Sequence, residues 1–141
     1  MLQKVSSAAC LILLMAVSSA FAAGQSADPV QLYECASPAE PEATLAAMAI
    51  CDATATSELS RRAEADNLQV REGALVVELD PSGVAGVSGL QVGDVIYRVG
   101  GIDVTSAESA ANQLTAIGTG FDTVVNFLRG GRPYRVKLRL P

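Results

Sequence analysis

The sequence predicts one small domain that mixes short β-strands with helices. The chain has 141 residues, which is enough for a single domain of modest size. Half of the residues are hydrophobic, but aromatic residues make up only 4% and tryptophan is absent. The core must therefore consist mainly of Leu, Val, Ile and Ala side chains. Runs of β-prone residues bounded by turn residues locate the strands, with clear alternation over 134–140, and apolar residues at i, i+4 and i+7 locate the clearest helix.

The beginning of the chain has the organisation of a secretory signal peptide. Lys4 supplies a positive charge, residues 8–17 are apolar, and Ala20-Phe21-Ala22 is a cleavage signal that places the cut before Ala23. The alternative is a membrane anchor, but the apolar run is far shorter than the ~20 residues that span a bilayer. We therefore expect cleavage rather than membrane insertion.

Three segments follow from this assignment. We expect a signal peptide over 1–22, a linker or arm rich in Ala, Pro and Glu over 23–44, and a domain over 45–141 with its core at 56–141. The mature protein is expected in the periplasm or the medium.

Two cysteines follow the cleavage signal, Cys35 and Cys51. An even pair in an exported chain predicts a structural disulfide. Two free thiols or a metal site are the alternatives. Two thiols without any histidine make a poor zinc site, and a catalytic redox pair usually has only two residues between its cysteines. We expect neither a metal nor a cofactor.

The charged residues argue against several classes of function. The net charge is −5, and removal of Lys4 makes it more negative. Nucleic acids and anionic lipids require a basic face, so neither is an expected partner.

Catalytic side chains are also scarce. The chain has no histidine, which excludes Ser-His-Asp and Cys-His triads and H-E-x-x-H zinc proteases. Lys137, the only lysine after the leader, lies on the polar side of an alternating strand pattern, so a Ser-Lys dyad is not expected. The carboxylates are scattered over loops and helices. The sequence therefore predicts a protein that is not an enzyme.

Residues 42–53 allow two structures. Their alanine content and the spacing of Leu45, Met48 and Ala49 favour a helix. A short strand over Met48 to Asp52 is the competing prediction.

The remaining elements follow from local signals. Thr105 and Glu108 predict a capping box at the start of a helix that ends at Gly118. Besides this helix we expect a short helix over 57–67 capped by Thr56 or Ser57, strands over 73–80, 94–99 and 102–104, a helical turn over 84–90, and a hairpin of strands 123–128 and 134–140.

The most specific motif is Gly89-Leu-Gln-Val-Gly-Asp-Val-Ile96. Gly89 and Gly93 suit left-handed backbone, Leu90 and Ile96 suit the core, and the carboxylate of Asp94 can accept hydrogen bonds from loop amides. The motif and the order of elements around it resemble the PDZ domains of bacterial envelope proteins, with their G-L-x-x-G-D-x-I signature. The resemblance covers about Thr56 to Pro141, and the strand order is similar to the permuted PDZ domains of HtrA-type proteases and type II secretion couplers.

This resemblance implies an α+β fold, namely a small, partly open β-barrel or sandwich of five to six strands with two short helices. It also implies a peptide-binding function, because PDZ domains add a peptide strand to a sheet edge beside a helix. The expected partners are protein C-termini or extended peptide segments of envelope proteins, bound by an adaptor or subunit of a protease, secretion or assembly system. A structural module with a closed groove and a truncated, non-catalytic relative of a PDZ-bearing protease are the alternatives.

The resemblance also suggests site residues. Ala107, Ala111 and Leu114 match the helix positions that line the groove, and with alanine first we expect an apolar preference at the ligand's third-from-last residue. The stretch Ala47-Met48-Ala49-Ile50 is the candidate for the loop that binds a terminal carboxylate, which places Met48, Ala49 and Ile50 in the site. Here Ala49 replaces the family's glycine, which requires a negative φ. If 42–53 is a helix, this loop does not exist.

Overall fold

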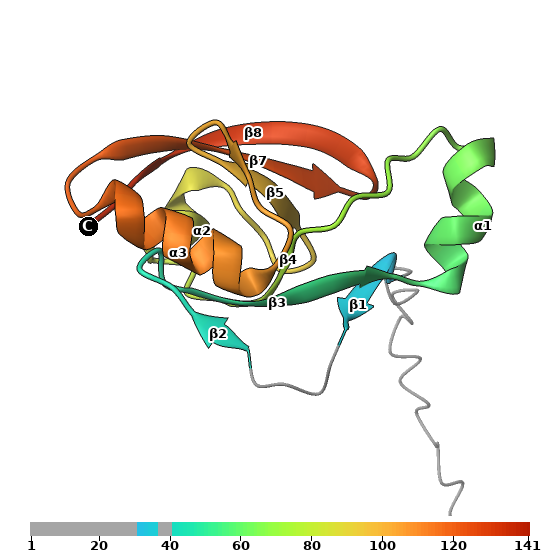
Figure 1. Ribbon diagram of the computed structural model, residues 1–141, viewed down its shortest axis with the longest axis horizontal. Coiled ribbons are helices and arrows are strands. Elements are labelled where there is room, and N and C mark those ends of the chain that lie inside the picture. Colours follow the sequence, from blue (N-terminus) through green and yellow to red (C-terminus); the bar gives the residue numbers. More distant parts are fainter. Residues whose placement is uncertain (1–30, 37–40) are drawn as a thin grey trace, which may run out of the picture.

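The computed structural model describes residues 31–36 and 41–141 (Figure 1). The signal peptide expected at 1–22 lies outside these described residues. In chain order the elements are β1 (Tyr33–Cys35), β2 (Glu42–Ala43), β3 (Met48–Ala55), α1 (Ser57–Ala65), β4 (Ala74–Leu79), α2 (Val84–Ser88), β5 (Val95–Val99), β6 (Ile102–Asp103), α3 (Ala107–Ile117), β7 (Asp122–Arg129) and β8 (Arg132–Arg139).

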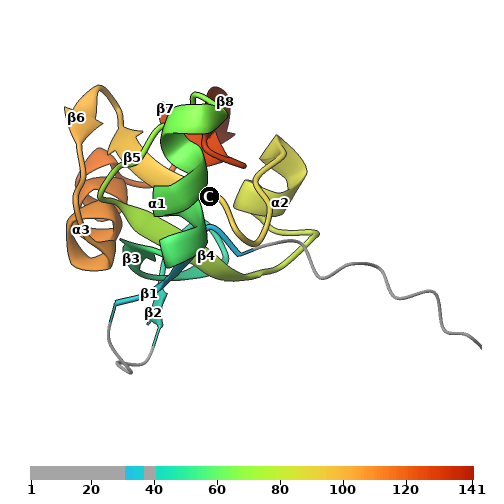
Figure 2. The same ribbon diagram turned by 90° about the vertical axis from the view of Figure 1, so that its right-hand side faces the viewer.

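The strands form one curved antiparallel sheet in the order β1-β3-β4-β5-β7-β8, with β2 paired to β3 and β6 paired to β5. In Figure 2, α3 and α2 lie at opposite ends of the curved sheet, and Ala85 of α2 belongs to the same core cluster as the buried residues of α3. This is the α+β, partly open architecture that the sequence predicts. The described residues contain eight strands and three helices, more than the five to six strands and two helices that the resemblance implies. The added strands are β1, β2 and β3, and the added helix is α1, which the local sequence over 57–67 predicts.

The region that we expected to be a linker or arm, 23–44, contributes to the sheet where it is described. Tyr33–Cys35 and Glu42–Ala43 are strands, and both pair with β3. The described part of this region is therefore an edge of the sheet.

Residues 42–53 do not form the helix that their alanine content favours, so that prediction was wrong and the competing strand is correct. β3 is flanked by β4 on one edge and by β1 and β2 on the other. Its side chains alternate, with Ile50 buried on one face and Cys51 on the other. Backbone pairing on both edges outweighs a local helix preference of a few tenths of a kcal/mol per residue.

The glycine-rich motif behaves as predicted. Gly89 and Gly93 have φ values of 105° and 97°, which favour glycine. Leu90 and Ile96 are buried in the core. The amide of Gln91 donates to the carboxylate of Asp94 over 2.8 Å.

Both longer helices have side-chain caps. Thr56 caps α1, as predicted, and Gly118 ends α3. The predicted capping box of Thr105 and Glu108 was wrong by one residue. Ser106 is the N-cap instead, and its hydroxyl accepts from the amide of Ser109 while the hydroxyl of Ser109 accepts from the amide of Ser106. Ser109, three positions after the N-cap, thus replaces the glutamate that a capping box usually has there.

Two apolar clusters fill the two sides of the sheet. The α3-side cluster contains buried residues of β3, β4, β5, β7, β8 and α3, with Phe127 its largest side chain. The α1-side cluster contains Tyr33, Cys51, Leu59, Leu75, Val95, Tyr97 and Leu128. Among the described helices none is both long and apolar enough to cross a membrane.

Candidate functional site

The candidate site lies where α3 packs beside β3. Five of the residues expected there from the sequence share the α3-side cluster, namely Met48, Ile50, Ala107, Ala111 and Leu114. Each of them is at most 8% exposed. Ala49 is only partly buried, because the side chains of a strand alternate between its faces. The structure therefore brings the predicted strand and helix positions together.

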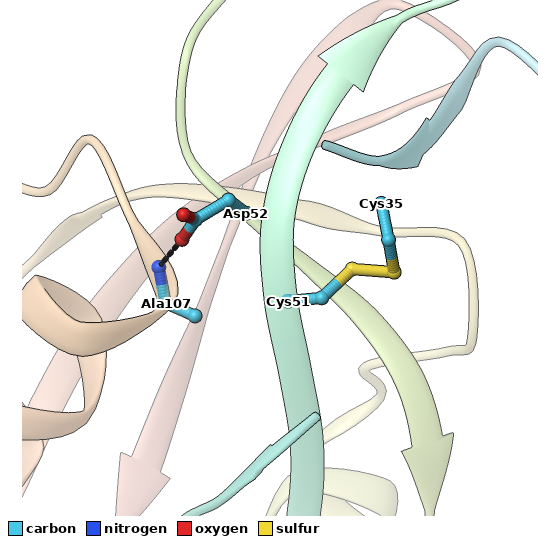
Figure 3. The surroundings of a disulfide bond; sticks show 4 residues. All are labelled: Cys35, Cys51, Asp52 and Ala107. Carbon is cyan, nitrogen blue, oxygen red and sulfur yellow. Dashed lines mark hydrogen bonds between the residues drawn. A yellow bond between two sulfur atoms is a disulfide. The ribbon is translucent and has the colours of Figure 1, made fainter. Parts of the chain in front are cut away.

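One hydrogen bond holds the start of α3 against β3. Oδ1 of Asp52 accepts from the amide of Ala107 over 2.7 Å (Figure 3). The first amides of a helix have no partner within the helix, and an anionic acceptor there is favoured by the helix dipole. Sequence analysis missed Asp52 because its partner lies 55 positions away.

The backbone of β3 is engaged on both edges. On the β4 edge, the amide of Ala53 donates to the carbonyl of Gly73 over 2.9 Å. On the opposite edge, β1 pairs with the end of β3 and β2 pairs with its beginning, both antiparallel. We call residues 32–36 and 41–44, which contain β1 and β2, the arm. The arm lies along the edge at which a PDZ domain would add a peptide strand.

β2 contacts α3 as well as β3. In Figure 1, β2 lies outside β3 near α3 and is joined to β3 by a short turn. This position between the strand and the helix corresponds to that of a bound peptide in the strand-addition mode. Sequence analysis did not identify the arm as part of the site, although the Cys35–Cys51 pairing was a signal that the arm lies beside β3.

The disulfide and one tyrosine fix β1 in place. Cys35 and Cys51 are bonded, as the sequence predicts, which joins the arm to β3 (Figure 3). Tyr33 is buried, and its hydroxyl donates to the carbonyl of Gln69 and accepts from the amide of Arg71, over 3.3 and 3.2 Å. Burial raises the pKa of the Tyr33 hydroxyl above its ordinary value, and this outweighs the hydrogen bond and the positive charge of Arg71, which lower it.

The turn between β2 and β3 uses several of its own amides. The amide of Thr44 donates to the carbonyl of Met48, that of Ala46 to the Thr44 hydroxyl, and that of Ala47 to the Thr44 carbonyl. Ala47 has a φ of 58°, a conformation that is unusual for a residue with a side chain. Ala49, which replaces the family's glycine, does not have a positive φ; among the described non-glycine residues only Ala47 and Asn67 do.

Two surface hollows lie near the candidate site, one of them lined in part by β3, and α3 lines neither of them. One of about 400 Å³ lies at the β2–β3 turn and includes Glu78 and Asp80 in its lining. The pKa of Asp80 lies below its ordinary value because the hydroxyl and amide of Ser82 donate to its carboxylate. The other, of about 540 Å³, lies between β1, β4 and the 91–94 loop on the α1 side.

The chain is similar to parts of periplasmic proteases. A relative from Haemophilus influenzae, named as a probable periplasmic serine protease of the do/HhoA-like type, is 31% identical over 78 residues, which are 55% of this chain and 17% of the relative. A probable DegP-like periplasmic serine endoprotease from Halomonas elongata is 34% identical over 71 residues, 50% of this chain and 15% of the relative. The chain thus spans about a sixth of these relatives. No protein-family model matches it.

Solved structures of HtrA-type proteases are also similar to this chain. The HtrA-type protease AlgW with a decapeptide aligns with a TM-score of 0.53 and 23% identity, over 67% of this chain and 28% of AlgW. AlgW with a tripeptide aligns with a TM-score of 0.50 and 23% identity, over 64% of this chain and 29% of AlgW. The HtrA3 PDZ domain with a phage-derived ligand aligns at 0.47 and 18% identity, over 60% of this chain and 74% of that domain. The two AlgW alignments confirm the fold expected from the glycine-rich motif.

Proposed function

We propose, from the premise that this chain carries a PDZ domain, that it binds extended peptide segments of other proteins at the edge of β3 beside α3. In this proposal it acts as a non-catalytic binding module, an adaptor or subunit in an envelope protease, secretion or assembly system. One observation carries the proposal: the β3 edge next to α3 binds an antiparallel extended segment, which is the chain's own arm.

The chemistry of the site suits an apolar peptide. Strand addition supplies backbone hydrogen bonds, and side-chain pockets supply the specificity. Ala107 and Ala111 carry small side chains and share one apolar cluster with Met48 and Ile50, so the residues at the contact between β3 and α3 are apolar. With alanine at the start of α3, no side chain there can bond a ligand Ser or Thr, which supports an apolar ligand residue at that place.

The charges at the β2–β3 turn favour internal segments over free C-termini. A terminal carboxylate placed at the turn would lie near Glu78 and Asp80, which line the adjacent hollow together with residues that carry no positive charge. Like charges at short range are unfavourable. The amides of Thr44, Ala46 and Ala47 also have partners within the turn. Binding of a C-terminus would require this turn to open.

Three observations support a location outside the cytoplasm. The first 22 residues have the pattern of a signal peptide, the disulfide is characteristic of an oxidising compartment, and both curated relatives are named as periplasmic. The absence of histidine from the chain supports a non-catalytic role.

A second function is favoured by the same edge. Because the arm pairs along β3, the domain could serve as a structural module whose groove is permanently closed. The two functions differ in whether any peptide enters the site.

An NMR titration distinguishes them. Isotope-labelled protein purified from the periplasm is titrated with apolar decapeptides that end in either a carboxylate or an amide, before and after reduction of the disulfide. Binding at the site predicts shifts at Ala107, Ala111 and the Met48–Ile50 stretch, with the amide form bound at least as tightly as the acid. An absence of such shifts in both redox states would support the structural module.

A further inference from the structure

We propose that the arm is an intramolecular competitor for the β3 edge, and that the Cys35–Cys51 disulfide determines whether another peptide can replace it. This inference rests on the proposed peptide-binding function, because it assigns a regulation to that same edge.

The arm uses the β3 edge from one end to the other. Hydrogen bonds or register pairs occur at every second residue from Met48 to Thr56, which directly follows β3, as expected for one edge of a strand. They are Thr44 N to Met48 O at 3.0 Å, the Glu42 and Ile50 pair, Ala36 N to Asp52 O at 2.8 Å, the Glu34 and Thr54 pair, and Thr56 N to Leu32 O at 3.0 Å. An incoming peptide needs these same backbone groups, so it cannot bind there until the arm leaves.

The two halves of the arm are held very differently. Both residues of β2 are exposed, so this half is held by backbone pairing with little side-chain burial. β1 is held by buried Tyr33 and by the disulfide at Cys35. The arm is therefore joined covalently to β3 at two places, by the turn that follows β2 and by the disulfide at β1, and of these two links only the disulfide can be opened by reduction.

A tethered competitor is effective even when its own contacts are weak. A segment linked to its site acts at an effective concentration of about millimolar for short linkers. The bond between Cys35 and Cys51 prevents β1 from leaving β3, since Cys51 is itself a residue of β3. A peptide in solution with micromolar affinity would then be excluded at ordinary concentrations.

Reduction by a dithiol would remove this link. The dithiol's thiolate attacks one sulfur and forms a mixed disulfide, which releases the other cysteine as a thiol after protonation. The second thiol of the reductant then displaces the remaining cysteine, so that two cysteine thiols form and the reductant becomes a disulfide. Cys35 is exposed and Cys51 is buried, so the reaction can begin from the Cys35 side.

Hydrogen exchange of the full mature protein tests the release without any substitution. The amides of Ala36 and Thr44 donate to β3 from the arm, whereas the amide of Ala53 donates to Gly73 on the other edge and serves as the internal control. On addition of dithiothreitol we expect the exchange of the two arm amides to accelerate by at least tenfold while the Ala53 amide keeps its protection. Unchanged protection of the arm amides after reduction would overturn the inference.

Peptide binding tests the competition. The probe is a fluorescent, amidated synthetic peptide that copies residues 32–44 with serine in place of Cys35. We expect the copy to bind the Y33A/C35S variant at least 100-fold more tightly than the oxidised wild-type protein. S60A, a substitution on the exposed face of α1, is the matched control and should behave as the wild type.

The outcomes separate the two proposals. Equal binding of the copy to oxidised wild type and to the variant would overturn the competition but keep the peptide site. Arm amides that open on reduction, together with no binding of the copy to any form, would overturn the peptide site itself. If the double variant does not fold, the copy is titrated against reduced wild-type protein with the same expected direction.

Discussion

Arg129 and Asp94, which are 35 positions apart in the chain, form an ion pair with two hydrogen bonds. Nε of Arg129 donates to Oδ1 of Asp94 over 2.9 Å, and Nη2 donates to Oδ2 over 2.8 Å. The same guanidinium donates to the carbonyl of Gly89 over 2.8 Å. The pair therefore fastens the glycine-rich motif to the hairpin of β7 and β8, and Asp94 is the one buried carboxylate among the described residues.

Replacement of Arg129 by methionine should destabilise the fold by about 2–4 kcal/mol, because the buried Asp94 carboxylate would lose the guanidinium that pairs with it. The free energy of unfolding is measured in urea. K137M, which removes the exposed ion pair of Lys137 with Asp122, is the control and should cost below about 0.5 kcal/mol. Similar losses in the two variants would contradict the role assigned to Arg129.

The two glycines between β7 and β8 should differ in their tolerance of alanine. Gly130 and Gly131 have φ values of 60° and 77°, so each substitution costs about 1 kcal/mol of backbone strain. A Cβ on Gly131 would also lie 2.7 Å from Cβ of Leu68, whereas one on Gly130 meets nothing within 4 Å. We expect G131A to lower the unfolding free energy by about 1–3 kcal/mol more than G130A. Equal losses of unfolding free energy in G131A and G130A would show that Leu68 moves away from the new Cβ.

Asp80 should titrate below the ordinary range of aspartate. The hydroxyl and the amide of Ser82 stabilise its charged form, which lowers the pKa of Asp80. Because the folded pKa is lowered, the stabilisation is present above the unfolded value and is lost as the pH falls through the folded pKa. NMR titration of the Asp80 carboxyl should show this shift, and S82A should return it toward the ordinary value. S60A, a substitution on α1 away from Asp80, is the control and should leave the Asp80 titration unchanged.

Alkaline pH should weaken the attachment of β1. Burial raises the pKa of the Tyr33 hydroxyl, so its contribution to stability is complete below the unfolded tyrosine pKa and is lost as the pH rises through the folded pKa. The tyrosinate can no longer donate to the carbonyl of Gln69.

Y33F provides the measurement for Tyr33. At neutral pH it should be less stable than the wild type by about 1 kcal/mol, because it lacks the two hydrogen bonds of the hydroxyl. The difference between the two proteins should narrow as the pH rises past the ordinary tyrosine range. A constant difference across that range would mean that the Tyr33 hydroxyl does not titrate differently on folding.

Local signals were sufficient for most of the fold. Runs of β-prone residues and turn signals located β4, β5 and β7, alternation located β8, and the spacing of Ala107, Ala111 and Leu114 located α3. The glycine-rich motif indicated the PDZ fold because each of its residues has a role that local geometry sets. The two glycines suit left-handed backbone, two apolar residues suit the core, and the aspartate accepts hydrogen bonds from loop amides. The cap of α3 was predicted at Thr105, one residue before the observed cap, Ser106. Adjacent Thr and Ser residues can both cap a helix, and small differences in local geometry decide between them.

The candidate site was predictable only in part. The sequence supplied both of its walls, Met48 to Ile50 and the face of α3 with Ala107, Ala111 and Leu114, and it supplied the disulfide. It did not show that Asp52 bonds to the first turn of α3, because that contact joins residues far apart in the chain.

The sequence by itself therefore determined the fold class, most of the elements and the cysteine pair, because propensity, periodicity and capping act within a few residues. Only the tertiary structure decided that 48–55 is a strand and that the chain's own arm lies along its outer edge. The physical reason is that a strand acquires its hydrogen bonds from partners that are distant in sequence. In β3 those partners lie on both edges, and together they outweigh the preference of an alanine-rich segment for a helix.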